Sequence, residues 1–356
     1  MVDLDIHIVQ GNLSAGNTMA LDSARDILLE AGQAHLQDKS KSNNAGAEVG
    51  VGVSVGVQTG VYVYAEASVG SGKSKSDSST WQNTTLTGQN ISLKAEGDTT
   101  LRGATATADR IDVKTGGTLT IESLQDVAES MSKDSQFGGR VQVSVGTAWD
   151  ASGYASASKA NGSYKGVGQQ SVLFAGDGGY HVDAGHVSFA GGAIASTNAA
   201  NSELTAETFA FTDLKNEMDY KATSAGISGG TGGAMVDGKP SMQGATGGVG
   251  AGVPVMESGG DSSTSYATPT EGNITIGGKK MTAAELGVST DASKAHQAID
   301  ALPDLQKLMR DTQVMGAAAG TVVATGQQIA ADIAAAKRNA AANAYLKKRS
   351  APRCVP

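Results

Sequence analysis

We predict an all-β fold for this chain of 356 residues, built as a parallel solenoid of short stacked strands with a short helical segment after it. Two forms of periodicity predict this fold. The chain repeats itself with a period of roughly ninety residues, and within each repeat apolar residues recur every ten positions. The composition agrees, because 48 glycines and only 4% aromatic residues suit thin, stacked β-structure better than a large globular core.

The long repeat becomes visible when the sequence is shifted by 88 residues. Glycines then coincide without a gap, at the pairs Gly88 and Gly176, Gly97 and Gly185, Gly103 and Gly191. Farther along the chain the offset is 90 residues, which aligns LTIESLQD from Leu119 with FAFTDLKN from Phe209. Two residues are therefore inserted between these segments.

The fine period consists of short apolar alternations separated by Gly, Asp or Asn turns such as AEGD and KTGG. Its apolar positions are Ile91, Leu101, Ile111 and Ile121, and again Ile194, Leu204 and Leu214. Strands this short are unstable alone, but stacked coils would pair their backbones about 4.8 Å apart and bury ladders of Ile and Leu. Two such steps, about twenty residues, would make one coil. A β-sandwich of antiparallel hairpins is the alternative, since ten-residue spacing also suits it.

The other texture is the Gly/Val/Ser-rich excursion, such as GVGVSVGVQTGVYVYAEASVGSGKSKS, which interrupts the ladder. It can form a long hairpin lying along the solenoid or a mobile loop. The chain as a whole then divides into four parts: a repeat solenoid over 1–220, a loosely ordered Gly/Ser-rich stretch over 221–270, a terminal strand and junction over 271–300, and an Ala-rich helical segment over 301–350.

Charge and hydropathy exclude several classes of function. The net charge of −8 argues against nucleic acid as a partner, because no basic stripe could neutralise its phosphates. No stretch reaches the roughly 18 apolar residues of a membrane-spanning helix. The N-terminus lacks the basic segment and continuous apolar run of a signal peptide, and the lone Cys354 excludes an intrachain disulfide.

One motif suggests a nucleotide site. ASVGSGKS, from Ala67 to Ser74, fits a loose phosphate-loop pattern and follows a strand-like segment. A phosphate loop also needs a helix after it, whereas the chain continues with KSDSSTWQNTTLTG, which carries no apolar helical stripe. The 88-residue shift lays the motif on ASASKANG, which lacks Gly-Lys-Ser. We therefore interpret Lys73 as a solvated charge.

Other candidates for chemistry also have simpler explanations. His181 and His186 would point to opposite faces of a strand, and His7, His35 and His296 are isolated. GDGGYHVDAGH, from Gly176, resembles calcium-binding nonapeptides, but those need tandem copies. The acidic residues that a glycan-cleaving β-helix would cluster on one face sit here beside glycines or at strand ends: Asp98, Asp109, Asp112 and Asp126. Cys354 has no partner pattern that would make it a nucleophile. We expect no catalytic, cofactor or metal site.

Three strings carry a family resemblance: STWQNTTLTGQNISLKAEGDTTLRGA from Ser79, IESLQDVAESMSKDSQFGGRVQVSVG from Ile121, and SYKGVGQQSVLFAGDGGYHVDAGHVSFAGGAIAS from Ser163. They resemble the hemagglutinin repeats of two-partner-secretion exoproteins, the filamentous hemagglutinins and contact-dependent growth inhibition proteins of Gram-negative bacteria. The similarity covers roughly residues 5–300, and GNITI followed by STDASKAHQAI and PDLQKL looks like the junction with a pretoxin region.

The resemblance implies a right-handed parallel β-helix on the cell surface, exported through an outer-membrane transporter and touching a receptor or glycan on a target cell. In the inhibition systems such a filament carries a C-terminal toxin, and no secretion domain precedes Met1 and no toxin follows Pro356 in this sequence. We therefore expect a non-catalytic stalk or adhesin module of a longer exoprotein. The alternative is a β-helix that binds or cleaves carbohydrate, and the nucleotide-binding enzyme is a third and weaker hypothesis.

Overall fold

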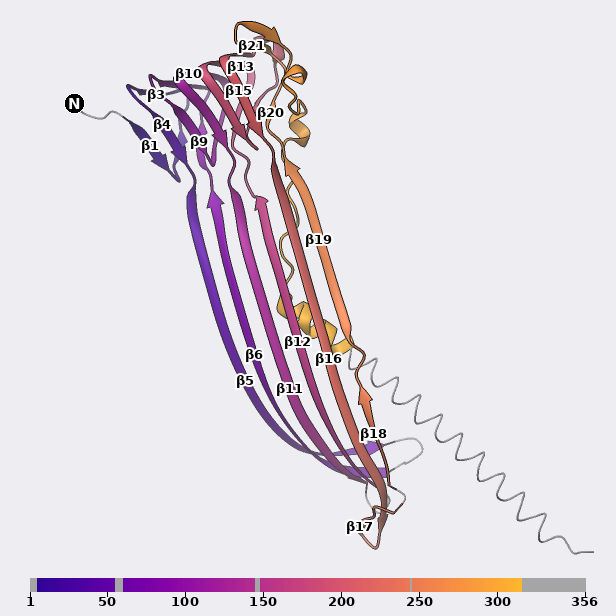
Figure 1. Ribbon diagram of the computed structural model, residues 1–356. Helices are drawn as coiled ribbons and strands as arrows, with labels where there is room; N and C mark the ends of the chain where they lie inside the picture. Colours follow the sequence, from indigo (N-terminus) through magenta and orange to yellow (C-terminus); the bar gives the residue numbers. More distant parts are fainter. Residues whose placement is uncertain (1–4, 55–59, 145–147, 244, 316–356) are drawn as a thin grey trace, which may run out of the picture.

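The computed structural model describes residues 5–54, 60–144, 148–243 and 245–315. The described chain is mostly β-structure and forms two sheets, one parallel in nearly all its pairs and one antiparallel. Neither sheet is closed on itself, and parallel and antiparallel pairing both occur in the described chain. Figure 1 shows the two as separate regions, a stack of short coils from which long hairpins project.

The first sheet contains the short strands of the stack and the long bent strands that run through several of its corners. Its members are β1 (Ile6–Val9), β2 (Asn12–Ser14), β3 (Thr18–Ser23), β4 (Ile27–Glu30), β7 (Thr84–Thr87), β8 (Asn90–Ala95), β9 (Thr99–Arg102), β10 (Ala104–Glu122), β13 (Val172–Ala190), β14 (Ala193–Ser196), β15 (Glu203–Thr212), β20 (Thr268–Pro269), β21 (Asn273–Ile276) and β22 (Lys279–Met281). Their pairing is parallel except between β21 and β22.

Parallel pairing arranges these strands in three rows, and the chain visits the rows in turn. In β10, for example, the first, middle and last segments pair with β7, β8 and β9 respectively. Ile111 lies opposite Ile91, twenty residues earlier, which confirms the predicted coil of about twenty residues. The parallel register excludes the antiparallel sandwich for this part of the chain.

Apolar ladders fill the inside of the stack. One ladder runs through the middle row and consists of Leu21, Leu93, Val113, Val182, Leu204 and Ile274, each opposite the next. All except the half-buried Leu21 are at most 2% exposed. Burying a side chain of this size stabilises a fold by about 1.5–3 kcal/mol, so the ladders are the main source of stability. Tyr180 belongs to this core, and burial raises its pKa to about 12.

The 88-residue shift corresponds to the geometry of the stack. It carries a position across two coils and one hairpin, so that Leu101 and Phe189 both lie opposite Ile121 in the same row. Gly103 and Gly191 take the same corner, with φ angles of +67° and +56°, where a left-handed backbone favours glycine. The insertion that changes the offset lies between β14 and β15, in the turn that holds the 3₁₀ helix η1 (Ala199–Asn201).

The second sheet consists of three long hairpin arms. Its strands are β5 (Gly32–Ser54), β6 (Gly60–Gln82), β11 (Gln125–Ser144), β12 (Ala148–Val167), β16 (Leu214–Val236), β17 (Lys239–Pro240), β18 (Thr246–Ala251) and β19 (Val255–Ser265). They pair antiparallel in the order β5, β6, β11, β12, β16, and β19 and β18 lie end to end along the outer edge of β16. A strand of 23 residues, such as β5, spans about 75 Å.

The structure shows which form the Gly/Val/Ser-rich excursions take. They are hairpins, as one of the two interpretations held, but they project away from the stack instead of lying along it (Figure 1). The first strands of the arms begin at Gly32, Gln125 and Leu214, 93 and 89 residues apart, which explains the ninety-residue period. Residues 221–270, for which composition predicts a loosely ordered stretch, contribute most of β16 together with β18, β19 and β20. Pairing satisfies their backbone, antiparallel for β16, β18 and β19 and parallel for β20.

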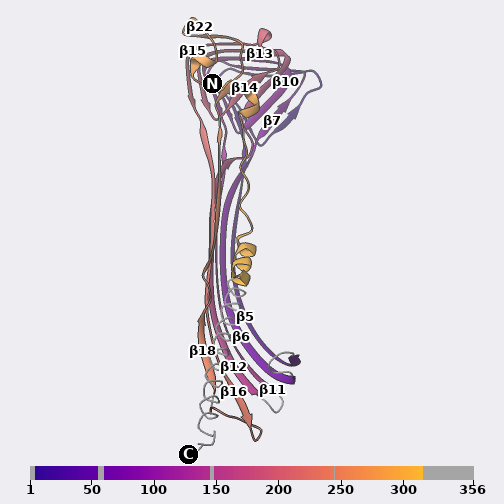
Figure 2. The same cartoon turned by 90° about the vertical axis from the view of Figure 1, so that its right-hand side faces the viewer.

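The chain leaves the stack through two short 3₁₀ helices, η2 (Ala284–Leu286) and η3 (Ala292–Lys294). It then runs back along the hairpin sheet and forms a helix over residues 305–315 (Figure 2). The helix agrees with the predicted helical segment, and the rest of that segment, 316–350, lies outside the described residues together with Cys354. No helix in the described part of the chain is long and apolar enough to cross a membrane.

Candidate functional site

ASVGSGKS lies in the middle of β6, with β5 on one side and β11 on the other. Its backbone is fully extended and paired on both edges, so the N–H groups that a phosphate loop would present to a nucleotide are engaged in the sheet. The chain continues as the same strand to Gln82 and no helix follows. The structure therefore gives this segment the geometry of a strand and not that of a nucleotide loop.

Each of the five histidines has its own set of neighbours. His181 and His186 both belong to β13 but occupy different rows, where His181 lies 3.5 Å from Asp112 and the ring of His186 is 2.8 Å from the hydroxyl of Thr208. The other three have their own partners: His7 with Glu30, His35 with Ser79, and His296 with Ser265. In the described ranges, no three His, Cys, Asp or Glu side chains come together as metal ligands would.

The candidate acidic residues lie apart and have different partners. Asp98 accepts a hydrogen bond from the backbone N–H of Thr118 at 2.6 Å, while Asp109 accepts one from Asp177 at 3.1 Å. Asp112 pairs with Arg110 at 2.7 Å. These carboxylates bridge one coil to the next or anchor a neighbour.

The fourth acidic candidate, Asp126, lies where β11 leaves the stack. It accepts the backbone N–H of Trp81 at 2.7 Å and so ties the second hairpin arm to the first. Burial raises the pKa of its carboxyl group, and the Trp81 hydrogen bond opposes that shift.

GDGGYHVDAGH forms part of β13 and its corners. Asp177 faces the turn between β14 and β15, where its side chain accepts the hydroxyl of Thr197 at 3.0 Å and its backbone carbonyl accepts the side-chain amides of Asn198 and Asn201. The motif thus supports the turn that contains the inserted residues.

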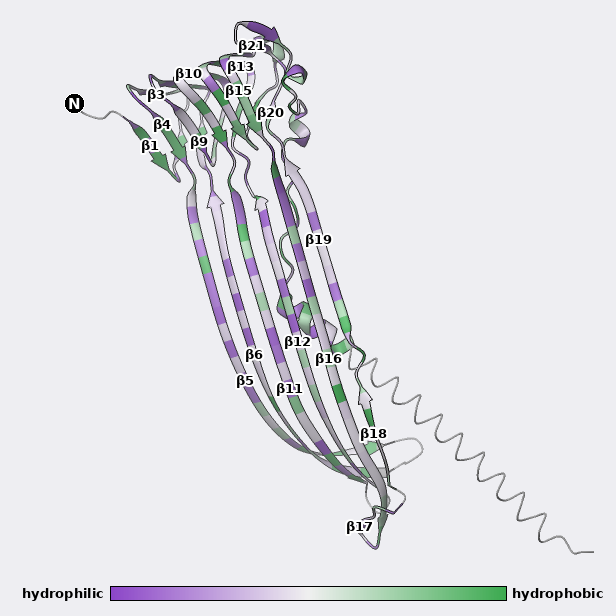
Figure 3. Ribbon diagram, in the orientation of Figure 1, coloured by the Kyte–Doolittle hydropathy of each residue, from purple (hydrophilic) through white to green (hydrophobic). Residues whose placement is uncertain are grey.

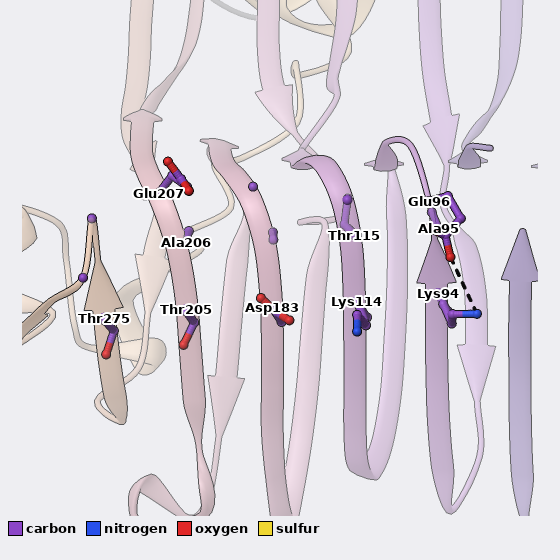
Figure 4. A pocket seen from close by; sticks show the side chains of 15 residues that line it. Lys94, Ala95, Glu96, Lys114, Thr115, Asp183, Thr205, Ala206, Glu207 and Thr275 are labelled. Carbon is purple, nitrogen blue, oxygen red and sulfur yellow. Dashed lines mark ion pairs between the residues drawn. The ribbon is translucent and has the colours of Figure 1, made fainter. Parts of the chain in front are cut away.

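A shallow groove of about 610 Å³ follows the corner that ends the middle row, and it crosses several coils. Figure 4 shows the side chains of Lys94, Lys114, Asp183 and Thr205 in lateral succession along its floor. Lys94 pairs with Asp22 at 3.3 Å and with Glu96 at 3.8 Å. The groove therefore presents two ammonium groups, then a carboxylate and then hydroxyl groups, so its lining is polar.

The hairpin sheet has two different faces, because side chains alternate across each strand. On the face formed by odd-numbered residues of β5, the distal half is apolar and open, and Val49, Val51 and Val53 are 81%, 70% and 70% exposed. Phe137 and Ile227 continue this face on β11 and β16 at 56% and 60% exposure. Figure 3 shows hydrophobic positions along these strands. An exposed apolar surface of this extent is typical of an interaction surface.

The other face is crossed over part of its length by residues 295–315, which we call the strap. Leu305 and Met309 of the strap are buried against Ala160 and Ala222 of the sheet. Polar contacts reach four strands: Gln306 to Ser74, Gln313 to Asp134 and Ser158, and the hydroxyl of Ser224 to the carbonyl of Thr312. The strap therefore joins hairpin arms from three successive repeats.

The upper end of the strap is held at the base of the sheet. The backbone carbonyl of Ala295 accepts the N–H of Tyr266 at 2.8 Å and the side-chain amide of Gln170 at 3.1 Å. Burial lowers the pKa of the neighbouring His296 imidazole, whose Nδ1 lies 3.2 Å from the hydroxyl of Ser265. The pattern PDLQKLMRDTQ predicts the helix of the strap, but the sequence did not predict that this segment packs against the hairpin sheet.

The model of the hemagglutinin repeat family matches residues 3–139. The chain is 34% identical over 325 residues to a protein of Escherichia coli STEC_O31 named tRNA nuclease CdiA. The aligned region covers 88% of this chain and 10% of the relative. It is 32% identical over 324 residues to a protein of Yersinia pseudotuberculosis YPIII named deoxyribonuclease CdiA, covering 89% of this chain and 29% of the relative.

A third relative, from Dickeya dadantii 3937 and also named deoxyribonuclease CdiA, is 30% identical over 229 residues, which is 63% of this chain and 7% of that protein. The chain thus spans about a tenth of the length of the first relatives it matches. The nuclease names describe those whole proteins. No solved structure matches the chain.

Proposed function

Because the chain belongs to the hemagglutinin-repeat exoproteins related to CdiA, we propose that it is a non-catalytic stalk module of a contact-dependent inhibition exoprotein on the surface of a Gram-negative bacterium. In this proposal the longer protein is exported through an outer-membrane transporter, and the module helps to deliver a C-terminal toxin to a neighbouring cell. The observation that carries the proposal is the similarity over 88% of the chain to proteins named as toxins and nucleases.

The architecture supports a mechanical and adhesive role. In our proposal the coils stack as a right-handed parallel β-helix. The hairpin arms extend about 75 Å from that stack and carry an exposed apolar face. We also propose that residues 1–220 form the repeat module and that 271–300 form the junction toward the toxin-bearing part. The strap, which begins within the end of this junction, then holds the start of the downstream region against the arms.

A chimera tests the proposal. The homologous segment of CdiA from E. coli STEC_O31 would be replaced by this chain, and inhibition of susceptible target cells would be measured in a growth competition. The proposal expects the chimera to inhibit target cells, whereas a matched protein with the segment deleted does not. A chimera as inactive as the deletion, although displayed at the cell surface in equal amount, would contradict it.

The runner-up function is recognition or cleavage of carbohydrate, and the groove at the end of the middle row favours it. Its floor carries carboxylates on Asp183 and Glu207 beside hydroxyls on Thr205 and Thr275. Incubation of the purified chain with a glycan panel separates the two functions, because cleavage releases reducing ends and a stalk does not. Release of product that the Asp183→Asn variant abolishes would overturn the non-catalytic proposal.

A further inference from the structure

Four lysines form a straight row across four strands of the hairpin sheet. Lys41 of β5 lies opposite Lys73 of β6, Lys73 lies opposite Lys133 of β11, and Lys133 lies opposite Lys159 of β12. Residues opposite one another in a sheet point to the same face, so the row lies on the face away from the strap. With strands roughly 4.8 Å apart, the four ammonium groups line a track of about 14 Å. We call these residues the lysine row.

The charges in the row are not compensated. All four side chains are exposed, and none forms an ion pair with another residue in the described ranges of the chain. The neighbouring row on the distal side is neutral and polar, made of Asn43, Ser71, Ser135, Ala157 and Ala225. Like charges directly opposite one another destabilise a sheet, so the register places these lysines at a cost to the fold.

The neighbouring row on the proximal side adds cations. It consists of Lys39, Lys75, Met131, Asn161 and Lys221. Carboxylates appear only one row farther, on Asp77, Glu129 and Asp219, where Asp77 already accepts a hydrogen bond from Gln37 at 2.8 Å and lies 3.8 Å from His35. The lysine row is thus separated from the acidic groups of its own face by a further row that is itself positive.

We propose that the lysine row is a binding site for a linear polyanion whose phosphate groups follow one another at short intervals. Lysine is a compact, strongly charged phosphate ligand, and a row of them at constant spacing matches a chain of charges better than a single anion. Neither flanking row holds an aromatic side chain on which a base could stack, which favours a phosphate polymer over single-stranded nucleic acid. The site does not depend on the proposed delivery role.

The test is a binding titration of the purified chain with fluorescently labelled inorganic polyphosphate, followed by anisotropy. Four lysines that release counterions give a slope of about −2.8 for log affinity against log salt, at about 0.7 per contact as for single strands. Affinity then falls about 50-fold between 50 and 200 mM salt. Because the whole chain carries a net charge of −8, binding at 50 mM requires a local site.

Two variants with the same change in net charge separate the lysine row from general electrostatics. K41Q/K73Q/K133Q/K159Q is expected to lose binding and its salt dependence, while K114Q/K279Q/K280Q/K307Q is expected to keep both. Circular dichroism checks that each variant folds, and removal of like charges from the row is expected to leave the fold intact.

Equal binding by both variants, or no binding by the native chain, would overturn the proposal. Preference of the lysine row for oligothymidylate or for vesicles of anionic lipid over polyphosphate would overturn it in favour of those ligands.

Discussion

Leu101→Ala tests whether the apolar ladders carry the stability of the coil stack. Leu101 is fully buried, and it lies opposite Leu29 on one side and Ile121 on the other, both of which are also fully buried. Because both neighbours are fixed in their own coils, the cavity left by three missing carbon atoms cannot collapse. We expect a loss at the upper end of the range for buried leucines, about 3–5 kcal/mol.

The matched control is Leu36→Ala, the same chemical change at a position that is 69% exposed on β5, where we expect a change within about 0.5 kcal/mol. Hydrogen exchange read by mass spectrometry measures the opening free energy of β9 and β10 directly and needs no assumption of two-state unfolding. A loss below about 1 kcal/mol for Leu101→Ala, or one equal to that of the control, would refute the role of the ladders.

Three further outcomes are expected. Gly103→Ala should lower the free energy of unfolding in urea by about 1–3 kcal/mol more than Gly238→Ala does. Both glycines have a positive φ, but only at Gly103 would an added Cβ lie 2.5 Å from the Cβ of Ala31; equal losses for the two variants would contradict this. Lys73→Ala should leave calorimetric titrations with ATP as flat as those of the native chain, and measurable heat that the substitution removes would restore the nucleotide hypothesis. The pKa of His296 is lower in the folded state than in the unfolded state, where it is near 6.5. The strap is therefore held most stably above that pH, and this stability is lost as pH falls below it. Hydrogen exchange at residues 295–299, corrected for its intrinsic pH dependence, should become faster at pH 5.5 in the native chain but not in His296→Gln.

Periodicity made the coil stack predictable. Ile91 and Ile111 repeat at twice the fine period because one coil returns the chain to the same row, and a buried row tolerates little but apolar residues. The glycines of the 88-residue shift coincide for a related reason, since Gly103 and Gly191 occupy corners with a left-handed backbone. The apolar period and the corner glycines each depend on the position of a residue within its own coil, so they are visible in a single sequence.

The arrangement of the hairpin arms could not be read in the same way. The sequence contains the Gly/Val/Ser alternation of each strand, but Lys73 and Lys133 are opposite one another only because arms from two repeats pair with a particular register. Exposed strands carry weak register information, since no buried face penalises a shift of two residues. The strap was hidden for another reason: its contacts with Ala160 and Ala222 join segments far apart in the chain, and small residues give no distinctive pattern.

Successive repeats each contribute a hairpin arm, and these arms pair side by side in register. Cysteines at Ser71 of β6 and Ser135 of β11, whose hydroxyl oxygens lie 3.2 Å apart, test this pairing in a chain with Cys354→Ser. We expect S71C/S135C to form an intrachain disulfide under mild oxidation and S71C/S132C not to form one, because Ser132 points to the opposite face and is buried. Absence of the first cross-link, or equal yields of both, would contradict it.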